Sequence, residues 1–520
     1  MAAIETPISR PDRRFVLLAG AAAATLTSGM ARAQEAVPGA DLSGDGAPFD
    51  RTRLVDYARA LSKRPYVAPN PALPDGLNGL NYDQYVGIRH RPERAIWGDE
   101  PRGFILEPLH RGFVFQTPVH ISLVEGGVAR KLVYSPARYD FGKLPVPGGN
   151  VGDIGFSGVR ILATSPDGPP REIAVFQGAS FLRAIARGQT FGAMARALSL
   201  KTADPRGEEF PQFRALFIER PARNDLIIVH ALLDSESVSG VFSYTIRNGD
   251  VTLIDTEAAI FPRVALDNVG LAGMQGTYLF SLTERRNIDD FRPSVYEVRG
   301  LQMNAGSGEW IWRPVSNPKQ LQISSFAMEN PRGFGFVMRD RDFNSFQDTD
   351  ARFEARPTLW VEPIGEWGAG AVQLMEIPSE NEIHDNILAT WRPREPMAAG
   401  SEHFFAYRQH WCWSPPERPQ LAMVSGTRIG RAGQQQRRRR FVVDFAGERL
   451  ATLKPEELQM AFWASNNGAQ NLRIIPGTDN RPWRVTFELD PGNETLVEMR
   501  LALMNGTAPV SETWLYRWTP

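Results

Sequence analysis

The sequence predicts an all-β protein with two domains, the second of which is a small β-sandwich of immunoglobulin-like size. Three observations lead to this prediction. The chain has 520 residues, and a single hydrophobic core rarely serves so long a chain. Its 46 glycines and 40 prolines suit many short strands and turns better than long helices. About the last hundred residues alternate apolar and polar side chains, which is the period of a half-buried strand.

The composition excludes several classes of protein. Hydrophobic residues make up 42% of the chain and charged residues 22%, so we exclude a disordered protein, a coiled coil and a polytopic membrane protein. The net charge of −1 argues against nucleic acid as a partner, because phosphate binding needs a basic excess. One cysteine excludes an intramolecular disulfide or a Cys-rich metal site. Histidine pairs at metal-binding spacing and nucleotide-binding motifs are lacking, and we expect no metal and no cofactor.

The first 33 residues have the organisation of a signal peptide. Arg13-Arg14 precede a short apolar run, and Ala31-Arg32-Ala33 supply a small-x-small cleavage site. The apolar run is too short for a stable membrane span. The arginine pair favours the twin-arginine export route, although a general-secretion signal with two arginines by chance remains the alternative. We expect the mature chain to be soluble and outside the cytoplasm.

The first element expected in the mature chain is an amphipathic helix over residues 51–63. Its apolar side chains recur at helical spacing at Leu54, Val55, Ala58 and Leu61. Short apolar runs then predict strands at 113–115, 132–134, 226–229 and 251–254. A hairpin turn is expected at Asn248-Gly249-Asp250, because Asn-Gly favours tight turns between antiparallel strands.

A domain boundary is expected at residues 411–433, where three prolines are followed by three glycines. This makes residues 34–410 the large domain and 434–520 the immunoglobulin-like domain. Within the latter, residues 483–489 and 497–503 alternate on either side of the turn 490–493, and we expect them to pair as an antiparallel hairpin. A last alternating strand is expected at Trp514, Tyr516 and Trp518.

Two features near this boundary have an ordinary interpretation. Residues 434–440 read Gln-Gln-Gln-Arg-Arg-Arg-Arg, which could contact a polyanion but suits a solvated strand or linker better in a chain with no basic excess. Cys412 lies between Trp411 and Trp413, and we expect a packed thiol rather than a nucleophile.

Residues 297–391 combine aromatic and charged side chains in the manner of a carbohydrate cleft. Five of the twelve tryptophans lie here, interleaved with carboxylates and arginines. A flat aromatic face suits the C–H face of a sugar, and charged groups bind its hydroxyls. Any single tryptophan here could equally be a core residue. The residues we expect to bind substrate are Trp310, Trp312, Arg339, Asp340, Trp360 and Trp367.

One loop in this region is rich in acidic groups. Strands expected at 374–377 and 387–391 enclose Glu380, Glu382 and Asp385. A carboxyl group crowded by like charges has a raised pKa, as a general acid at neutral pH requires. Ser379 and Glu382 could instead form a helix capping box. Glycoside hydrolysis needs an acid on one side of the bond and a carboxylate on the other, and the pattern alone does not name the second group.

At these residues the sequence resembles the bacterial periplasmic glucan biosynthesis proteins G and D (OpgG and OpgD, also called MdoG and MdoD). The resemblance covers nearly the whole mature chain in order. The motifs that carry it are Gly308-Glu309-Trp310-Ile311-Trp312-Arg313-Pro314, Met328-Glu329-Asn330-Pro331, Gly365-Glu366-Trp367-Gly368, Glu376-Ile377-Pro378, Asp385-Asn386-Ile387, Gly207-Glu208-Glu209-Phe210-Pro211 and Phe441-Val442-Val443-Asp444-Phe445. The twin-arginine signal resembles the D branch.

The resemblance implies a large N-terminal β-sandwich of galactose mutarotase-like type, a C-terminal immunoglobulin-like sandwich, and a periplasmic role in making β-1,2-glucans. It implies an inverting endo-glucanase or transglycosylase, with β-1,2-glucan as its partner and an inner-membrane glucan synthase as a further possible contact. The alternative is a non-catalytic glucan-binding or scaffold protein of the same pathway.

The resemblance also implies two catalytic residues. The general acid is the Asp of the family's Asp-Asn-Ile motif, here Asp385. The general base is an Asp shortly before the Gly-Glu-Trp-Ile-Trp run, acting through water, and its place is taken here by Glu297. The extra methylene of Glu moves the carboxylate by roughly an ångström. Phe181 and Phe191 also depart from the family, which has Tyr at both positions.

Overall fold

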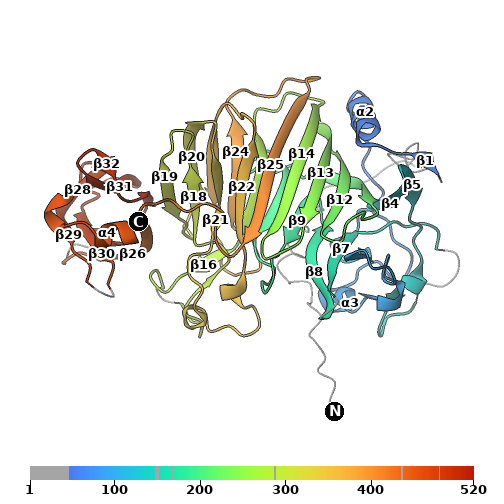
Figure 1. The fold of residues 1–520 in the computed structure, drawn as a ribbon, viewed down its shortest axis with the longest axis horizontal. Helices are drawn as coiled ribbons and strands as arrows, with labels where there is room; N and C mark the ends of the chain where they lie inside the picture. The colour runs from blue at the N-terminus through green and yellow to red at the C-terminus, as the bar shows by residue number, and fades with distance from the viewer. Residues whose placement is uncertain (1–45, 147–150, 166–167, 286–287, 435–436, 479–480) are drawn as a thin grey trace, which may run out of the picture.

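Two large β-sheets stacked face to face form the body of the molecule, so the all-β prediction is confirmed (Figure 1). The computed structural model describes residues 46–146, 151–165, 168–285, 288–434, 437–478 and 481–520. The predicted signal peptide, residues 1–33, lies outside these ranges.

The first sheet runs through the whole molecule. Over the described residues it has 16 strands. In spatial order they are β1 (Ala47–Pro48), β5 (Val128–Lys131), β4 (His120–Glu125), β11 (Gln212–Glu219), β12 (Leu226–Asp234), β13 (Val238–Arg247), β14 (Thr252–Pro262), β25 (His403–Cys412), β22 (Thr358–Ile364), β21 (Gly333–Val337), β18 (Gly300–Asn304), β19 (Trp310–Pro314), β33 (Thr513–Trp518), β31 (Val497–Asn505) and β28 (Leu458–Ala464), with β32 (Ala508–Pro509) beside β31.

The second sheet has nine strands in the described part of the chain and faces the first across the main core. Its order is β20 (Gln322–Glu329), β23 (Ala369–Glu376), β24 (Ile387–Pro393), β15 (Val269–Gly276), β10 (Met194–Leu200), β9 (Phe181–Ala184), β8 (Gly168–Gln177), β7 (Gly158–Ser165) and β3 (Phe104–Leu109). Two short pairs complete the large domain: β16 (Tyr278–Phe280) with β17 (Val295–Tyr296), and β2 (Arg89–His90) with β6 (Tyr139–Asp140).

The predicted N-terminal helix is confirmed as α2 (Arg51–Ser62). The Asp50 carboxylate accepts a hydrogen bond from the Arg53 N–H and thereby caps the first turn. Its buried face packs on the outer surface of β12–β14. The other α-helices described are α3 (Tyr82–Val86) and α4 (Glu448–Ala451), and none of the helices in the described ranges is long and apolar enough to cross a membrane.

The strands and hairpin expected at 226–254 are confirmed, and two earlier predictions are wrong. Residues 113–115 form a turn, because Gly112 and Phe113 have φ values of 153° and 53°. Residues 132–134 follow the end of β5. The Tyr134 N–H donates to the Asp153 carboxylate and not to the backbone carbonyl of a neighbouring strand. The first run and both end residues of the second, Leu132 and Tyr134, are nevertheless buried or half-buried, whereas Val133 is exposed. Burial without strand pairing therefore explains the errors.

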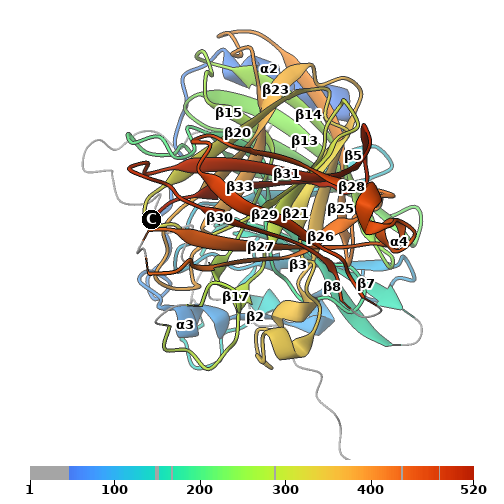
Figure 2. The same cartoon turned by 90° about the vertical axis from the view of Figure 1, so that its left-hand side faces the viewer.

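The C-terminal strands form a second, smaller sandwich (Figure 2). A four-stranded sheet of β26 (Met423–Arg431), β27 (Arg439–Ala446), β30 (Trp483–Leu489) and β29 (Ala469–Ile475) packs against β28, β31 and β33. The alternation expected in β30, β31 and β33 is confirmed by their burial patterns. The prediction that β30 and β31 pair as a hairpin is wrong, because the two strands belong to opposite sheets and face each other across the core.

The expected linker over 411–433 is too long. β25 continues through Cys412, and β26, which begins at Met423, is already part of the C-terminal sandwich. The connection is therefore residues 413–422. The sandwiches are also joined by a parallel pair of strands, β19 and β33, in which Ile311 lies opposite Thr513.

Candidate functional site

The Asp385 side chain is held inside the loop between β23 and β24. It is 3% exposed, and its carboxylate accepts hydrogen bonds from Gln275 Nε2 at 3.0 Å and Thr277 Oγ1 at 3.2 Å. The next residue anchors the loop: Asn386 accepts from the Tyr278 N–H and donates to the carbonyls of Tyr278 and Ile377. These bonds fix the position of Asp385 relative to the start of β16.

The Glu297 side chain is buried on the other side of the same residue, Thr277. Its backbone N–H donates to the Thr277 carbonyl at 2.8 Å, next to the pairing of β16 with β17. The carboxylate is 1% exposed and lies 3.6 Å from the Arg356 guanidinium. The Arg356 guanidinium is therefore the charged group that faces the Glu297 carboxylate inside the buried site.

Thr277 therefore contacts both predicted catalytic residues. Its hydroxyl lies within hydrogen-bond distance of Asp385 and of the His384 carbonyl (3.1 Å), and its carbonyl accepts from Glu297. The chain can approach this closely because the preceding residue is Gly276. A Cβ there would lie 2.7 Å from Val298 Cγ2, so a larger residue would push the Glu297 segment away.

A buried polar network continues from Gln275 into the second sheet. Arg196 donates to the Gln275 side-chain oxygen and to Glu208. Its guanidinium lies beside a pair of aromatic rings, 5.5 Å from the Phe181 centroid and 5.7 Å from the Phe210 centroid. Arg196 is thus held by charge, hydrogen bonds and stacking, and it orients the amide that contacts Asp385.

The other acidic groups of the loop have surroundings different from those of Asp385. Glu382 forms an ion pair with Arg292 at 2.7 Å, and Glu380 is exposed. The capping-box alternative is wrong, because residues 377–386 form bends and turns with no helix, and the Ser379 hydroxyl donates to the Asn381 carbonyl.

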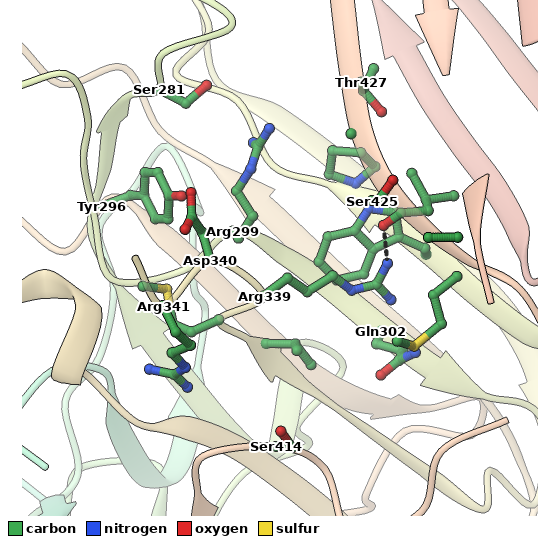
Figure 3. A pocket seen from close by; sticks show the side chains of 18 of the residues that line it. Ser281, Tyr296, Arg299, Gln302, Arg339, Asp340, Arg341, Ser414, Ser425 and Thr427 are labelled. Carbon is green, nitrogen blue, oxygen red and sulfur yellow. Dashed lines mark hydrogen bonds between the residues drawn. The ribbon is translucent and has the colours of Figure 1, made fainter. Parts of the chain in front are cut away.

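Three of the predicted substrate-binding residues line a cavity between the two sandwiches (Figure 3). They are Trp312, Arg339 and Asp340. The Arg339 guanidinium stacks 3.5 Å above the Trp312 ring and pairs with the buried Glu512 carboxylate at 2.6 Å. Arg339 therefore lies at the junction between the sandwiches, and its binding of substrate hydroxyls stays a prediction.

The other three predicted binding residues lie at two separate places. Trp310 and Trp360 stack on each other, 5.9 Å between centroids, on the outer face of the first sheet, and Trp360 is 2% exposed. Trp367 packs in the core against Trp391 and Tyr407. The structure therefore places the tryptophans predicted to bind substrate at separate positions, and their part in substrate binding stays a prediction.

Sequence reasoning missed Gln275, Thr277 and Arg196. The one signal that could have revealed them is a polar residue within a strongly apolar strand. Gln275 interrupts the run Leu271–Phe280 and is fully buried, which requires a specific polar partner. The partner, Asp385, is 110 residues away in the sequence, and no local pattern identifies it.

The two features near the boundary have the ordinary roles expected. Cys412 is buried at the end of β25, and burial raises the pKa of its thiol to about 12. Arg438 and Arg440 both pair with Glu488 on the neighbouring strand β30, as suits a solvated strand. In the described ranges, no group of three or more His, Cys, Asp or Glu side chains is placed to hold a metal ion.

Comparison with known proteins gives a consistent result over the chain. The model of the family "Periplasmic glucan biosynthesis protein, MdoG" matches residues 49–518. "Glucans biosynthesis protein G" of Shewanella sp. (strain MR-7) is 46% identical over 476 residues, which cover 91% of this chain and 87% of that protein. "Glucans biosynthesis protein G 1" of Shewanella oneidensis shows the same identity and coverage.

Among solved structures, a galactose mutarotase related enzyme from Lactobacillus acidophilus matches 50% of this chain and 96% of its own, with 10% identity and a TM-score of 0.22. A similarity at that level carries no argument about this chain, and the expected galactose mutarotase-like type stays a prediction.

Proposed function

The chain belongs to the family of periplasmic glucan biosynthesis proteins, and from that premise we propose that it acts in the periplasm on β-1,2-glucan as an inverting endo-glucanase or transglycosylase. The family and its relatives support the role in glucan biosynthesis. The linkage and the reaction rest on the residues around Thr277.

In this mechanism Asp385 protonates the oxygen of the glycosidic bond. The Thr277 hydroxyl can donate to the His384 carbonyl and accept from Asp385 at the same time. A protonated Asp385 therefore keeps its hydrogen bond, as a general acid must between turnovers. The Gln275 amide binds the second carboxyl oxygen and fixes the orientation of the group.

Glu297 activates the acceptor from the opposite side. In this mechanism the Glu297 carboxylate, which lies beside Arg356, accepts a proton from a water molecule or, through water, from a sugar hydroxyl. Inversion requires room for that acceptor between the carboxyl groups, so a relay through water fits a base that is itself buried. When the acceptor is a sugar hydroxyl the product is a longer chain, and when it is water the chain is cleaved.

The observation that carries this proposal is that one residue, Thr277, contacts both nominated carboxyl-bearing residues. Asp385 and Glu297 are 88 residues apart in the sequence (385 − 297). Acid and base must be held in fixed relative positions for concerted proton transfer, and a shared neighbour provides this.

The test is the Asp385→Asn variant incubated with linear β-1,2-glucan. We expect a normal fold by circular dichroism and a loss of turnover on the order of a hundredfold or more, because Asn cannot donate the proton. Glu380→Gln, an exposed change in the same loop, is the control and should keep wild-type turnover. Wild-type product formation by Asp385→Asn, measured by chromatography, would show that the assignment of the acid is wrong.

The burial of Glu297 against Arg356 favours a second candidate function, a glucan-binding scaffold without turnover. The resemblance implies the shorter Asp at this position, so the Glu297 carboxylate is displaced by about an ångström from the place that suits activation of water. Binding of β-1,2-glucan by calorimetry, without new reducing ends or altered chain lengths, would favour the scaffold.

A further inference from the structure

The cavity between the two sandwiches has a volume of about 540 Å³, within the range of small-molecule sites. One wall comes from the large domain, including residues 281–283 and 337–341 together with Ser294, Tyr296, Arg299 and Gln302. The other wall comes from the connection and from β26, including residues 413–415 and 423–428. Asp385 and Glu297 do not line it, so the cavity is separate from the proposed catalytic site.

The charged side chains of this cavity are mostly positive. Five arginines line it, against the single carboxylate of Asp340. Arg339 and Arg428 are neutralised by Glu512 and Asp444. The other three, Arg299, Arg341 and Arg418, form no ion pair with a carboxylate within the described part of the chain. The lining thus has an excess of cationic groups over its own anions.

Arg299 is the least satisfied of these arginines. Its Nη2 lies 3.5 Å from Thr283 Oγ1, and its guanidinium lies 5.7 Å from the centroid of the Tyr296 ring. Its Nη1 is buried and has no hydrogen-bond partner among the described residues. Burial works against the charge of Arg299, but the nearby Tyr278, Tyr296 and Glu284 side chains raise its pKa, so the cation is partly compensated. Its buried Nη1 still lacks a hydrogen-bond partner, and a bound oxyanion would supply one.

Hydroxyl side chains line the same cavity as the Arg299 guanidinium. In Figure 3 it points into the part of the cavity between Ser281 and Thr427. Thr427 Oγ1 accepts a hydrogen bond from Trp514 Nε1 at 3.0 Å, which leaves its own proton free to donate. Ser281 and Thr283 lie 3.0 Å apart, and together they also have a proton to offer. A cavity that combines a guanidinium with hydroxyl donors is complementary to a phosphate or carboxylate group.

Arg341 contributes further positive charge from the same wall of the large domain. Its guanidinium donates to the carbonyls of Glu354 (3.0 Å) and Trp413 (2.9 Å), so neutral groups hold it in place. Burial lowers the pKa of Arg341 to about 10, and it therefore remains charged at neutral pH. The charge is not cancelled locally and adds to the attraction for an anion.

We propose that this cavity binds the oxyanion, phosphate or carboxylate, of a small molecule the size of a substituted sugar, with Arg299 and the hydroxyls of Ser281, Thr283 and Thr427 as its ligands. The site is distinct from the glucan site, and it joins surfaces of both sandwiches. The bound molecule would hold the two together.

The test is isothermal titration of the full mature chain with four probes: inorganic phosphate, glucose 6-phosphate, glucuronate and, as the neutral control, glucose. We expect saturable binding of at least one anionic probe and none of glucose. Phosphate-bearing probes binding alone would identify a phosphate site, and glucuronate binding alone a carboxylate site.

Variants then assign the binding to the cavity. Arg299→Met should weaken the affinity for the anionic probe by about tenfold or more, the value of one lost charge-assisted bond. Arg299→Lys keeps the charge but loses the planar fork, and it should weaken binding less. Arg64→Met, which removes an exposed arginine at the end of α2, is the matched control and should leave affinity unchanged.

Two results would overturn the proposal. One is the absence of saturable binding of all three anionic probes to the wild-type protein. The other is wild-type affinity in Arg299→Met or, if that variant does not fold, in Arg299→Lys. Neither result depends on glucan turnover, so the failure of this proposal and the failure of the proposed function are distinguishable.

Discussion

At the scale of single residues, Thr277 is the position on which the proposed chemistry depends most directly. It contacts Asp385 through its hydroxyl and Glu297 through its carbonyl. We expect Thr277→Val to keep the fold and the KM but to lower kcat about tenfold or more, because the hydroxyl that orients the acid is lost. Thr277→Ser restores the hydroxyl and should restore most of the activity. A valine variant with wild-type kcat would show that Thr277 has only a structural role.

Glu297 determines the balance between hydrolysis and transfer in this scheme. Its extra methylene, relative to the Asp expected from the family, places the carboxylate about an ångström away from the position suited to activate water. A sugar hydroxyl held in the site then competes well as acceptor. We expect Glu297→Asp to raise the ratio of hydrolysis to transglycosylation, measured from product lengths on linear β-1,2-glucan. An unchanged ratio in a correctly folded variant would contradict this explanation and leave the role of Asp385 unaffected.

At the scale of elements, the short strands at the N-terminal end of the large domain depend on neutral histidines. Burial lowers the pKa of His90 in β2, of His110 after β3 and of His120 in β4 to about 4 each. The ordinary value in the unfolded chain is about 6.5. Their contribution to stability is therefore fully present above pH 6.5 and is lost as the pH falls from 6.5 to 4.

The lowered pKa values of these histidines predict that acid destabilises this part of the fold. For the nearly buried His110, the loss at pH 5 is up to about 2 kcal/mol of unfolding free energy, by linkage. We expect the urea midpoint to fall between pH 7 and pH 5, and amide exchange to increase first in β2, β3 and β4. His120→Gln should reduce the pH dependence, whereas a variant at the more exposed His384 should not change it. An equal midpoint at both pH values would contradict the prediction.

The elements also show how far sequence reasoning reaches. Apolar periodicity identified α2, β12, β14, β30, β31 and β33, because burial of one face is a local property of the chain. It did not identify the partner of β31, since alternation and a turn are common to a hairpin and to two strands that face each other across a core. It also placed strands at 113–115, where an apolar run is buried in a turn.

The residues of the candidate site also differ in how well the sequence predicts them. The resemblance nominated Asp385 and Glu297, and the structure places both beside Thr277. The tryptophans were assigned by composition, which cannot distinguish a ring that faces solvent from one that covers glycines of a sheet. Trp360 shows why: a Cβ on Gly333 would lie 2.4 Å from its ring, so Trp360 lies flat over that strand. Such contacts form between strands that are distant in the sequence.

At the scale of the whole molecule, the two sandwiches are joined more tightly than a flexible linker would allow. The first sheet continues from β19 into β33, so backbone hydrogen bonds run from one domain into the other. Beside this pairing, the fully buried Glu512 carboxylate accepts from Arg339, from Gln302 Nε2 at 3.1 Å and from the Val424 N–H. Trp312 and Val337 of the large domain also belong to the C-terminal core.

This junction predicts that the mature chain unfolds in one calorimetric transition, because neither sandwich can lose its structure without exposing the shared strands and core of the other. Glu512→Gln preserves the shape of the side chain but leaves Arg339 without its counter-charge, and it should cost about 3–5 kcal/mol, the usual effect of breaking a buried ion pair. The weakened junction should then separate the melt into two transitions, with the smaller sandwich unfolding first. Glu448→Gln, an exposed change in α4, should melt as the wild type does. Two transitions in the wild-type protein, or a Glu512→Gln melt like that of the control, would contradict the argument, because each would mean that the sandwiches are stable independently of β33 and its ion pair.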